Sequence, residues 1–151
     1  MRRILETSAL TEAQLENART LAENCNLYES LDYLHPTTDM ASHGNHFHFY
    51  DNEKLIGFLT FPFNGIRDPE AYLIVDPPHR RKGIGRTLLD AAKESCKRRG
   101  IQQFLLVWRL RQGKSTLRRM LRNLEGVRRL VRGSQHTRPT IQDRILEEQL
   151  R

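Results

Sequence analysis

The spacing of apolar residues near the start of the chain is that of an amphipathic helix. Apolar residues recur at intervals of one to three positions from Ala13 to Cys25, compatible with one helical face, and Thr11 followed by Gln14 forms a capping-box pattern ahead of them. Because a capping box satisfies backbone N–H groups where a helix begins, the pattern predicts a helix over residues 11–25.

Three runs of strand-like residues follow this helix. Residues 46–50, HFHFY, alternate polar and apolar side chains, and a polar turn separates them from the apolar run KLIGFLTF at 54–61. Residues 70–75, EAYLIV, form a third run that two prolines end. The first two runs predict a β-hairpin, and the third predicts a further strand.

The period of the pattern changes after Gly83. Apolar residues from Ile84 to Cys96 are spaced for a helix that Gly100 ends, and the run IQQFLLV at 101–107 predicts a short buried strand. A strand–helix–strand passage joins parallel neighbours, whereas hairpins join antiparallel ones. The expected fold class is therefore α/β, with a mixed, mostly antiparallel sheet flanked by helices.

The chain changes character after Val107. Residues 1–107 carry a net charge of −1 and ten of the eleven aromatic residues, whereas residues 108–151 carry a net charge of +8 and only Trp108. The net charge of the whole chain is +7, so the basic excess lies entirely in the second segment. Because composition shifts at one point, we expect a domain over residues 1–107 and a basic, arginine-rich tail over residues 108–151.

The stretch VDPPHRRKGIGRTLL, residues 75–89, carries the candidate chemistry. It ends a strand, places basic residues and two glycines in a loop, and then starts a helix. The N-terminus of a helix presents unpaired backbone N–H groups and a partial positive charge, and glycine lets a phosphate approach the backbone closely. The layout predicts a site for a phosphorylated ligand around Gly83 and Gly85. An ordinary loop with solvated basic side chains is the alternative interpretation.

Residues 80–85, with the sequence RRKGIG, resemble the Gln/Arg-x-x-Gly-x-Gly/Ala signature of the GCN5-related N-acetyltransferase (GNAT) superfamily. The resemblance covers about residues 45–107 and implies the acyl-CoA N-acyltransferase fold with acetyl-coenzyme A as co-substrate. The closing C-terminal strands of that fold are expected to be missing or replaced here, because residues 108–151 lack strand-like runs.

By this resemblance, backbone N–H groups of the loop hold the pyrophosphate of the coenzyme. The pantetheine arm pairs with the backbone of the preceding strand, where a splay from the next strand leaves edge groups free. The residues implied in binding acetyl-coenzyme A are Leu73, Ile74, Val75, Arg80, Arg81, Lys82, Gly83, Ile84, Gly85 and Arg86.

The resemblance also implies direct attack of a primary amine on the acetyl thioester. Glu70, at the start of the third strand, is similar to the glutamate that some members use as general base, and the backbone N–H of Val75 is the expected oxyanion donor. Family members often carry a later tyrosine that protonates the thiolate, but residues 108–151 contain no tyrosine. A coenzyme-A-binding protein without turnover is therefore the alternative to an active N-acetyltransferase.

Two pairs of potential ligands have a structural explanation. His46 and His48 have the spacing of a metal-binding pair, but no cysteine or acidic partner lies nearby, so we expect satisfied strand histidines and no metal. Cys25 and Cys96 both fall in helix-like patterns, so we expect buried thiols and no disulfide framework.

Three interpretations of residues 108–151 stay open. Apolar residues from Leu117 to Val131 recur at helical spacing, as in a basic amphipathic helix for nucleic acid, an anionic membrane or an acidic partner. The charge and low aromatic content also fit a disordered extension. Translation out of frame would equally leave an arginine-dominated segment without strands. Nucleic-acid binding through this tail is a rival function, although nucleic acid is not the partner we expect.

Composition narrows the remaining classes. No apolar run approaches the ~20 residues that span a bilayer, and the start of the sequence has no run long enough for a secretion signal. We expect a cytoplasmic protein without a membrane partner, compatible with an oligomer, whose acceptor is a small-molecule amine or a protein amine. Glu29, Asp32 and Asp39 are candidates to line a site for a cationic amine.

Overall fold

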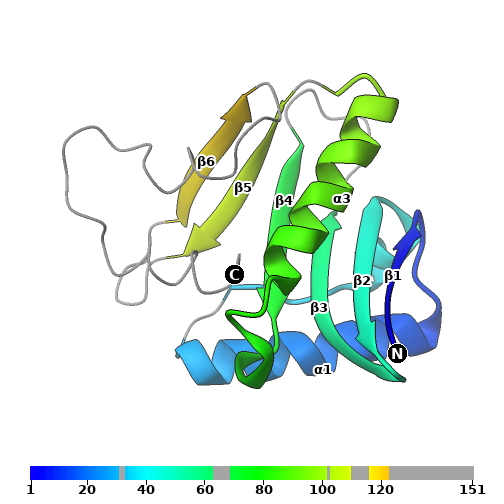
Figure 1. Ribbon diagram of the computed structural model, residues 1–151, viewed down its shortest axis with the longest axis vertical. Coiled ribbons are helices and arrows are strands. Elements are labelled where there is room, and N and C mark those ends of the chain that lie inside the picture. Colours follow the sequence, from blue (N-terminus) through cyan, green and yellow to red (C-terminus); the bar gives the residue numbers. More distant parts are fainter. Residues whose placement is uncertain (31–32, 63–68, 102, 110–115, 123–151) are drawn as a thin grey trace.

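The computed structural model describes residues 1–30, 33–62, 69–101, 103–109 and 116–122. Within these ranges the chain forms a six-stranded sheet with strand order β1-β2-β3-β4-β5-β6 (Figure 1). All neighbouring strands are antiparallel except β4 and β5, which are parallel. The elements are β1 (Arg2–Thr7), α1 (Glu12–Glu29), α2 (Thr38–Ser42), β2 (Asn45–Asp51), β3 (Lys54–Phe61), β4 (Glu70–Val75), the 3-10 helix η1 (Pro77–His79), α3 (Ile84–Arg98), β5 (Gln103–Arg109) and β6 (Thr116–Arg122).

The two long helices belong to different buried clusters, one on each face of the sheet (Figure 1). Leu73 and Val75 of β4 pack with the buried residues of α3, whereas Ile74 packs with those of α1. This division follows from the alternation of side chains along a strand. The strand β4 is therefore covered from both sides, and the loop that begins α3 follows directly from its end.

The predicted start of α1 is confirmed. Thr11 is the N-cap: the Gln14 N–H donates to its hydroxyl at 3.2 Å, and the Thr11 N–H donates to the Gln14 side-chain oxygen at 2.9 Å. The helix continues past the predicted end to Glu29, where Ser30 adopts a left-handed conformation with φ 54°. The two reciprocal hydrogen bonds satisfy the backbone N–H groups of Thr11 and Gln14, which is why this sequence pattern marks the start of the helix correctly.

The predicted mixed α/β sheet is also confirmed. The strands β3 and β4 coincide with the two predicted runs, and α3 ends just before Gly100, which has φ 73°. The strand β2 differs in one respect, because it is buried at almost every position and not only at alternate ones. Both faces of β2 are covered, so its polar histidines are as buried as its phenylalanines.

Two elements carry little sequence signal and were not predicted. The strand β1 has only Ile4 and Leu5 as apolar residues and is largely exposed, so no alternation marks it. It forms because its backbone pairs along its whole length with β2. The short helix α2 is held by Thr37, whose hydroxyl accepts from the Met40 N–H at 3.3 Å.

The expectation that strands are missing after Val107 is corrected by the structure. The strand β5 runs to Arg109, and Thr116–Arg122 form β6, which pairs antiparallel with β5 over its full length. Leu117, Met120 and Leu121 have helical spacing, but they lie in a strand and not in a helix. Backbone pairing with β6 satisfies the N–H and C=O groups on the outer edge of β5, and this pairing does not depend on the spacing of apolar side chains. Residues 123–151, and with them the rest of the tail hypothesis, lie outside the described residues. Among the described residues no helix is long and apolar enough to cross a membrane.

Candidate active site

A gap opens between β4 and β5 toward their C-terminal ends. Their parallel pairing covers three residue pairs and ends at Tyr72 and Val107. The strand β4 continues to Val75 and β5 to Arg109, but within these described strands no pair follows. Strands that separate leave backbone N–H and C=O groups on their facing edges without a strand partner. The gap thus offers an extended ligand those backbone groups that no side chain already binds.

The register with β3 decides which groups of β4 face this gap. The Asp76 N–H donates to the Ile56 carbonyl at 2.8 Å, which makes these residues a hydrogen-bonded pair of the antiparallel ladder. Such pairs alternate, so the N–H and C=O of Ile74 face β3, whereas those of Leu73 and Val75 face the gap. Of the three strand residues predicted to pair with pantetheine, Leu73 and Val75 present their backbone to the gap and Ile74 does not.

Two side chains hold the carbonyl of Val75. Arg80 Nε donates to this oxygen at 2.9 Å and Cys25 Sγ donates to it at 3.4 Å. Burial raises the pKa of Cys25 to about 11, so the thiol keeps its proton and continues to donate near neutral pH. With the carbonyl held in this way, the Val75 N–H is the backbone donor that this end of the strand presents to the gap.

The loop between β4 and α3 contains two left-handed residues. Arg81 has φ 64°, and Gly83, the N-cap of α3, has φ 82°. A non-glycine residue in this region costs on the order of 1–3 kcal/mol, and such strain is concentrated at functional sites. Left-handed residues in a turn bring successive backbone N–H groups together as an anion-binding concavity. The first turn of α3, at residues 84–86, adds N–H groups that have no partner within the helix.

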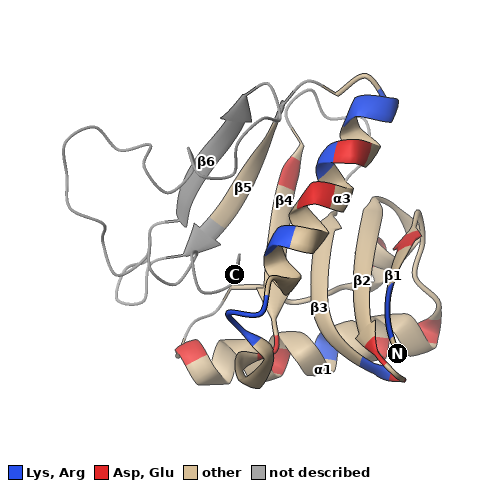
Figure 2. Cartoon of the chain, viewed as in Figure 1, with Lys and Arg blue, Asp and Glu red and all other residues tan. Residues whose placement is uncertain are grey.

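Exposed cations surround this loop. Arg81, Lys82 and Arg86 are exposed, and the loop leading into α3 is blue in Figure 2. Their charge adds to the partial positive charge of the helix N-terminus. Backbone geometry and side-chain charge together therefore fit a diphosphate.

Arg80 lies behind the loop and not on its surface. Its side chain is only 4% exposed, pairs with the carboxylate of Glu29, and lies over the Tyr28 ring at 5.3 Å. Its Nη2 has no hydrogen-bond partner among the described residues. Because a buried cation needs a compensating charge, the pair with Glu29 fixes the loop to the end of α1. The sequence placed Arg80 in the coenzyme site, and the structure places its side chain in support of Val75.

Gly57 allows α3 to lie close to the sheet. A Cβ at this position would lie 2.8 Å from Ile84 Cγ2 and 2.9 Å from Leu88 Cδ1. Gly57 is also the ladder partner of Val75. The absence of a side chain here therefore brings the first turn of α3 next to the open end of β4. Sequence reasoning missed this glycine, because its role depends on which helix crosses β3.

Comparison with known proteins agrees with this geometry. Residues 9–116 match the Acetyltransferase (GNAT) family. The chain belongs to this family. The match confirms the resemblance that the RRKGIG signature indicated, and it identifies the protein as an N-acetyltransferase with the acyl-CoA N-acyltransferase fold.

Solved structures share the fold of this GNAT acetyltransferase at low sequence identity. The ribosomal-protein-S18-alanine N-acetyltransferase from Escherichia coli is 21% identical with a TM-score of 0.50, over 75% of this chain and 70% of that chain. An acyl-CoA N-acyltransferase from Pseudomonas aeruginosa is 14% identical with a TM-score of 0.58, over 72% and 80%. The PaiA N-acetyltransferase from Thermoplasma acidophilum, in complex with coenzyme A, is 19% identical with a TM-score of 0.51, over 74% and 82%. No curated protein sequence matches the chain.

Glu70 lies at the opposite end of β4 from the loop that precedes α3 in the GNAT protein. Its carboxylate accepts a hydrogen bond from the Tyr72 hydroxyl at 3.2 Å. At about 3.3 Å per residue, Glu70 lies roughly 16 Å along the strand from Val75. Transfer of a proton to Glu70 from an amine near Val75 therefore requires intervening water.

The two histidines of β2 are buried and hydrogen-bonded. His46 bonds to the Thr60 hydroxyl at 2.8 Å and to the His43 carbonyl at 3.2 Å, so both of its ring nitrogens are satisfied as expected. His48 bonds to the Thr7 hydroxyl at 3.0 Å through Nε2, but its buried Nδ1 has no hydrogen-bond partner among the described residues, so the expectation is met only in part. Burial lowers the pKa of both, that of His48 to about 4, so both are neutral at pH 7. In the part of the chain that the structure describes, no group of three His, Cys, Asp or Glu residues is placed to hold a metal ion.

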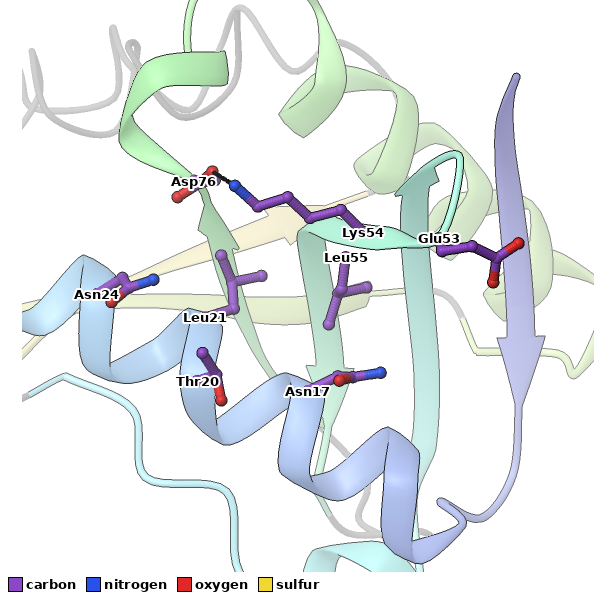
Figure 3. Close-up of a pocket in the computed structure, with 8 residues that line it drawn as sticks. All are labelled: Asn17, Thr20, Leu21, Asn24, Glu53, Lys54, Leu55 and Asp76. Atoms are coloured by element: carbon purple, nitrogen blue, oxygen red, sulfur yellow. Dashed lines mark ion pairs between the residues drawn. The ribbon is translucent and has the colours of Figure 1, made fainter.

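A separate groove of about 410 Å³ lies between α1 and the β2–β3 turn (Figure 3). An ion pair between Lys54 and Asp76, with an N–O distance of 3.3 Å, crosses one side of it. Leu21 and Leu55 give it an apolar centre. Asp76, directly after β4, lines this groove, but among the described residues none of β5 and none of residues 80–86 does, so the groove is distinct from the β4–β5 gap. Its other lining residues are Asn17, Thr20, Asn24 and Glu53.

Proposed function

We propose that this GNAT protein transfers an acetyl group from acetyl-coenzyme A to a primary amine. The observation that carries the proposal is the position of the left-handed loop at Arg81 and Gly83, which follows directly from the strand edge that opens into the gap. An extended coenzyme needs an anion site for its diphosphate and backbone groups for its amide-bearing arm. One strand and the loop after it supply both.

The diphosphate is assigned to the start of α3. Backbone N–H groups from Arg81 to Arg86 donate to its oxygens, and the exposed side chains of Arg81, Lys82 and Arg86 add charge-assisted hydrogen bonds. The lack of a side chain at Gly83 and Gly85 lets the phosphates approach the backbone. The Ile84 N–H, which lies between the two glycines in the first turn of α3, is a further donor to the phosphates.

The pantetheine arm is assigned to the gap and runs from the loop to Val75, and Leu73, whose N–H donates to the Tyr33 hydroxyl, lies at the acyl end of the site. The Ile74 backbone faces β3, so its part in the site is to hold the strand straight through the β3 ladder. The side chain of Arg80 supports the same edge through the Val75 carbonyl. These assignments keep every predicted coenzyme residue in the site but separate those that contact the ligand from those that position it.

The chemical step is attack of the neutral amine nitrogen on the thioester carbon. The Val75 N–H stabilises the tetrahedral oxyanion, a contribution of about 10²–10³ in rate for a positioned donor. Glu70 accepts the amine proton through water, the carbon–sulfur bond breaks, and the electron pair leaves with the coenzyme thiolate. The product is an N-acetylated amine.

The acceptor is proposed to be a primary amine of a small molecule or of a protein. Its class is supported by the family alone, in which the similar Escherichia coli protein is named for acetylating a ribosomal protein. Of the acidic residues considered for a cationic acceptor, Glu29 is buried against Arg80 and Asp39 is exposed in the first turn of α2. Asp32 lies outside the described residues. The carboxylate of Glu29 is therefore not available to a cationic acceptor.

The coenzyme assignment can be tested with a matched pair of glycines. Gly83 and Gly100 flank α3, and both have left-handed φ values, 82° and 73°. Replacing either glycine by alanine costs about 1 kcal/mol of backbone strain. Calorimetry with acetyl-coenzyme A is expected to show a loss of affinity of about ten-fold or more for Gly83→Ala and little change for Gly100→Ala. Equal affinities of the two variants would contradict the site.

Turnover is tested by release of free coenzyme A thiol in the presence of a panel of primary amines. Amine-dependent release supports the transferase. Binding of acetyl-coenzyme A without release, for every amine in the panel, favours the alternative of a coenzyme-A-binding protein without turnover. Steep salt dependence of nucleic-acid binding by the full chain, with no coenzyme binding, favours the tail-based rival.

A further inference from the structure

Tyr33, between α1 and α2, reaches the point where β4 and β5 separate. Its hydroxyl accepts a hydrogen bond from the Leu73 N–H at 3.2 Å and donates one to the Val107 carbonyl. The last residue pair of the parallel ladder is Tyr72 with Val107. In a parallel ladder the hydrogen bond that closes this pair runs between the Leu73 N–H and the Val107 carbonyl, the same two groups that the Tyr33 hydroxyl contacts. The phenol therefore lies at this last pair and closes the narrow end of the gap.

The side chain of Tyr33 extends between the two faces of the sheet. It packs against the buried cluster that includes α3 and also against the cluster that includes α1. Its ring lies 5.7 Å from the ring of Tyr72, on the α1 face. Burial raises the pKa of Tyr33, so the hydroxyl keeps its proton and continues to donate to Val107. The Tyr33 side chain thus closes the gap at the end where β4 and β5 begin to separate, and its position is fixed.

The Tyr33 side chain lies close to the reacting end of the coenzyme. The Val75 N–H is on the same edge of β4, two residues or roughly 6.6 Å beyond the Leu73 N–H that Tyr33 holds. In a planar thioester whose oxygen accepts from the Val75 N–H, the sulfur lies on the side of the coenzyme loop. The third substituent of the carbonyl carbon, the acyl chain, is then directed away from that loop and toward Tyr33.

We propose that Tyr33 determines acyl-chain specificity and limits the donor to acetyl-coenzyme A. The proposal rests on the proposed function, because it uses the thioester position at Val75. A methyl group fits between this position and the phenol, whereas each further methylene meets the Tyr33 side chain. Discrimination by one methylene in a closed pocket is typically about 10–200-fold.

The test measures binding of coenzyme A and of its acetyl, propionyl and butyryl thioesters to the full chain by calorimetry, which needs no acceptor amine. The natural chain is expected to bind butyryl-coenzyme A at least about ten-fold more weakly than acetyl-coenzyme A. In Tyr33→Ala this ratio is expected to fall to about one, with the affinity for coenzyme A itself little changed. An unchanged ratio in a folded Tyr33→Ala would overturn the inference while leaving the coenzyme site intact.

Two further variants separate specificity from stability. Tyr33→Leu shortens the side chain with less loss of packing, and it is expected to accept propionyl-coenzyme A even if Tyr33→Ala does not fold. Met40→Ala removes a buried side chain of the α1-face cluster away from the gap and is expected to lose stability without any change in the acyl ratio. A widened acyl range in Met40→Ala, or none in either folded Tyr33 variant, would contradict the assignment. Failure of the natural chain to bind any of the four compounds would instead remove the proposed function, and the inference with it.

Discussion

The strand β4 is paired differently with its two neighbouring strands, β3 and β5. Along β3 it is paired antiparallel, and the pairing extends past the strand end to the hydrogen bond between Asp76 and Ile56. Along β5 it is paired parallel for only three residues, after which the strands separate. We call the β3–β4 pairing the closed seam and the β4–β5 boundary the open seam. The closed seam gives β4 a fixed position. The open seam can then expose backbone groups to a ligand without loss of the fold.

The difference between the seams teaches how a buried strand can also be a binding surface. Backbone groups alternate in direction, so one residue of β4 serves the closed seam and the next serves the open one. Ile74 and Val75 are such neighbours, and both are aliphatic and fully buried. Their side chains give no indication of the different tasks of their backbones.

The largest expected effect comes from proline at these two neighbouring positions, because proline removes one N–H. Ile74→Pro removes a ladder hydrogen bond to β3 and is expected to destabilise the fold by about 3 kcal/mol or more. Val75→Pro removes the donor that faces the gap, and it is expected to lower kcat by about 10²–10³ with a much smaller loss of stability. Urea unfolding and amine-dependent thiol release measure the two outcomes.

The comparison between the seams fails if the two proline variants behave alike. Equal destabilisation would mean that both N–H groups serve the β3 ladder. Full activity of a folded Val75→Pro would remove the Val75 N–H from the oxyanion site.

The next effect concerns the paired end of the open seam, where Glu70 lies. Glu70→Gln keeps an acceptor for the Tyr72 hydroxyl but removes the proposed base, so we expect kcat to fall by about 10² with little change in acetyl-coenzyme A binding. Glu94→Gln, an exposed carboxylate on α3, is the matched control and is expected to retain activity. Activity of Glu70→Gln equal to that of the control would show that another group or water accepts the proton.

A stability effect is expected from His48, which is buried in β2 away from the open seam. Burial holds its pKa in the folded chain at about 4, below the value of about 6.5 for the unfolded chain. The unfolded chain therefore binds the proton first. Stability from neutral His48 is complete above pH 6.5 and is lost as pH falls toward 4, by up to about 3 kcal/mol.

Urea unfolding between pH 7 and pH 4 tests this dependence. His48→Gln retains a side chain that can bond to the Thr7 hydroxyl but does not titrate, so its stability is expected to fall less steeply with acid. The account of His48 as a neutral structural residue is contradicted if the variant and the natural chain show the same slope.

The smallest predicted effect concerns Gly57 of β3, which lies against the first turns of α3, next to the proposed coenzyme loop. Gly57→Ala places a methyl group against Ile84 and Leu88 and is expected to cost about 1–3 kcal/mol in unfolding free energy. Displacement of the first turn of α3 is also expected to weaken acetyl-coenzyme A binding by a few-fold. A variant with reduced stability and unaltered binding would show that the loop does not depend on this contact.

Much of the fold could be predicted from the sequence wherever local signals agreed with packing. The capping box at Thr11, the prolines after β4 and the glycines around α3 each mark a boundary through backbone chemistry. The strands β1 and β6 could not be predicted in this way, because few of their residues are both apolar and alternating. They form by pairing with the edges of β2 and β5, which is a tertiary effect.

The candidate site was predicted in part for the same reason. The loop signature at residues 80–85 is local, so the sequence identified it. The positions of Tyr33 and Gly57 depend on contacts with residues distant in the sequence, namely Val107 and α3. The burial of Arg80 likewise depends on the approach of Glu29 from α1. No local pattern reports such contacts.

Amide hydrogen exchange of the full chain, with and without acetyl-coenzyme A, tests the central claim most directly. The account predicts slower exchange at residues 81–86 and at Val75 when the coenzyme is bound, with no change in the paired residues of β2 and β3. Unchanged exchange in the loop, with protection confined to α1 and the β2–β3 turn around the groove of Figure 3, would place the coenzyme elsewhere and contradict the account.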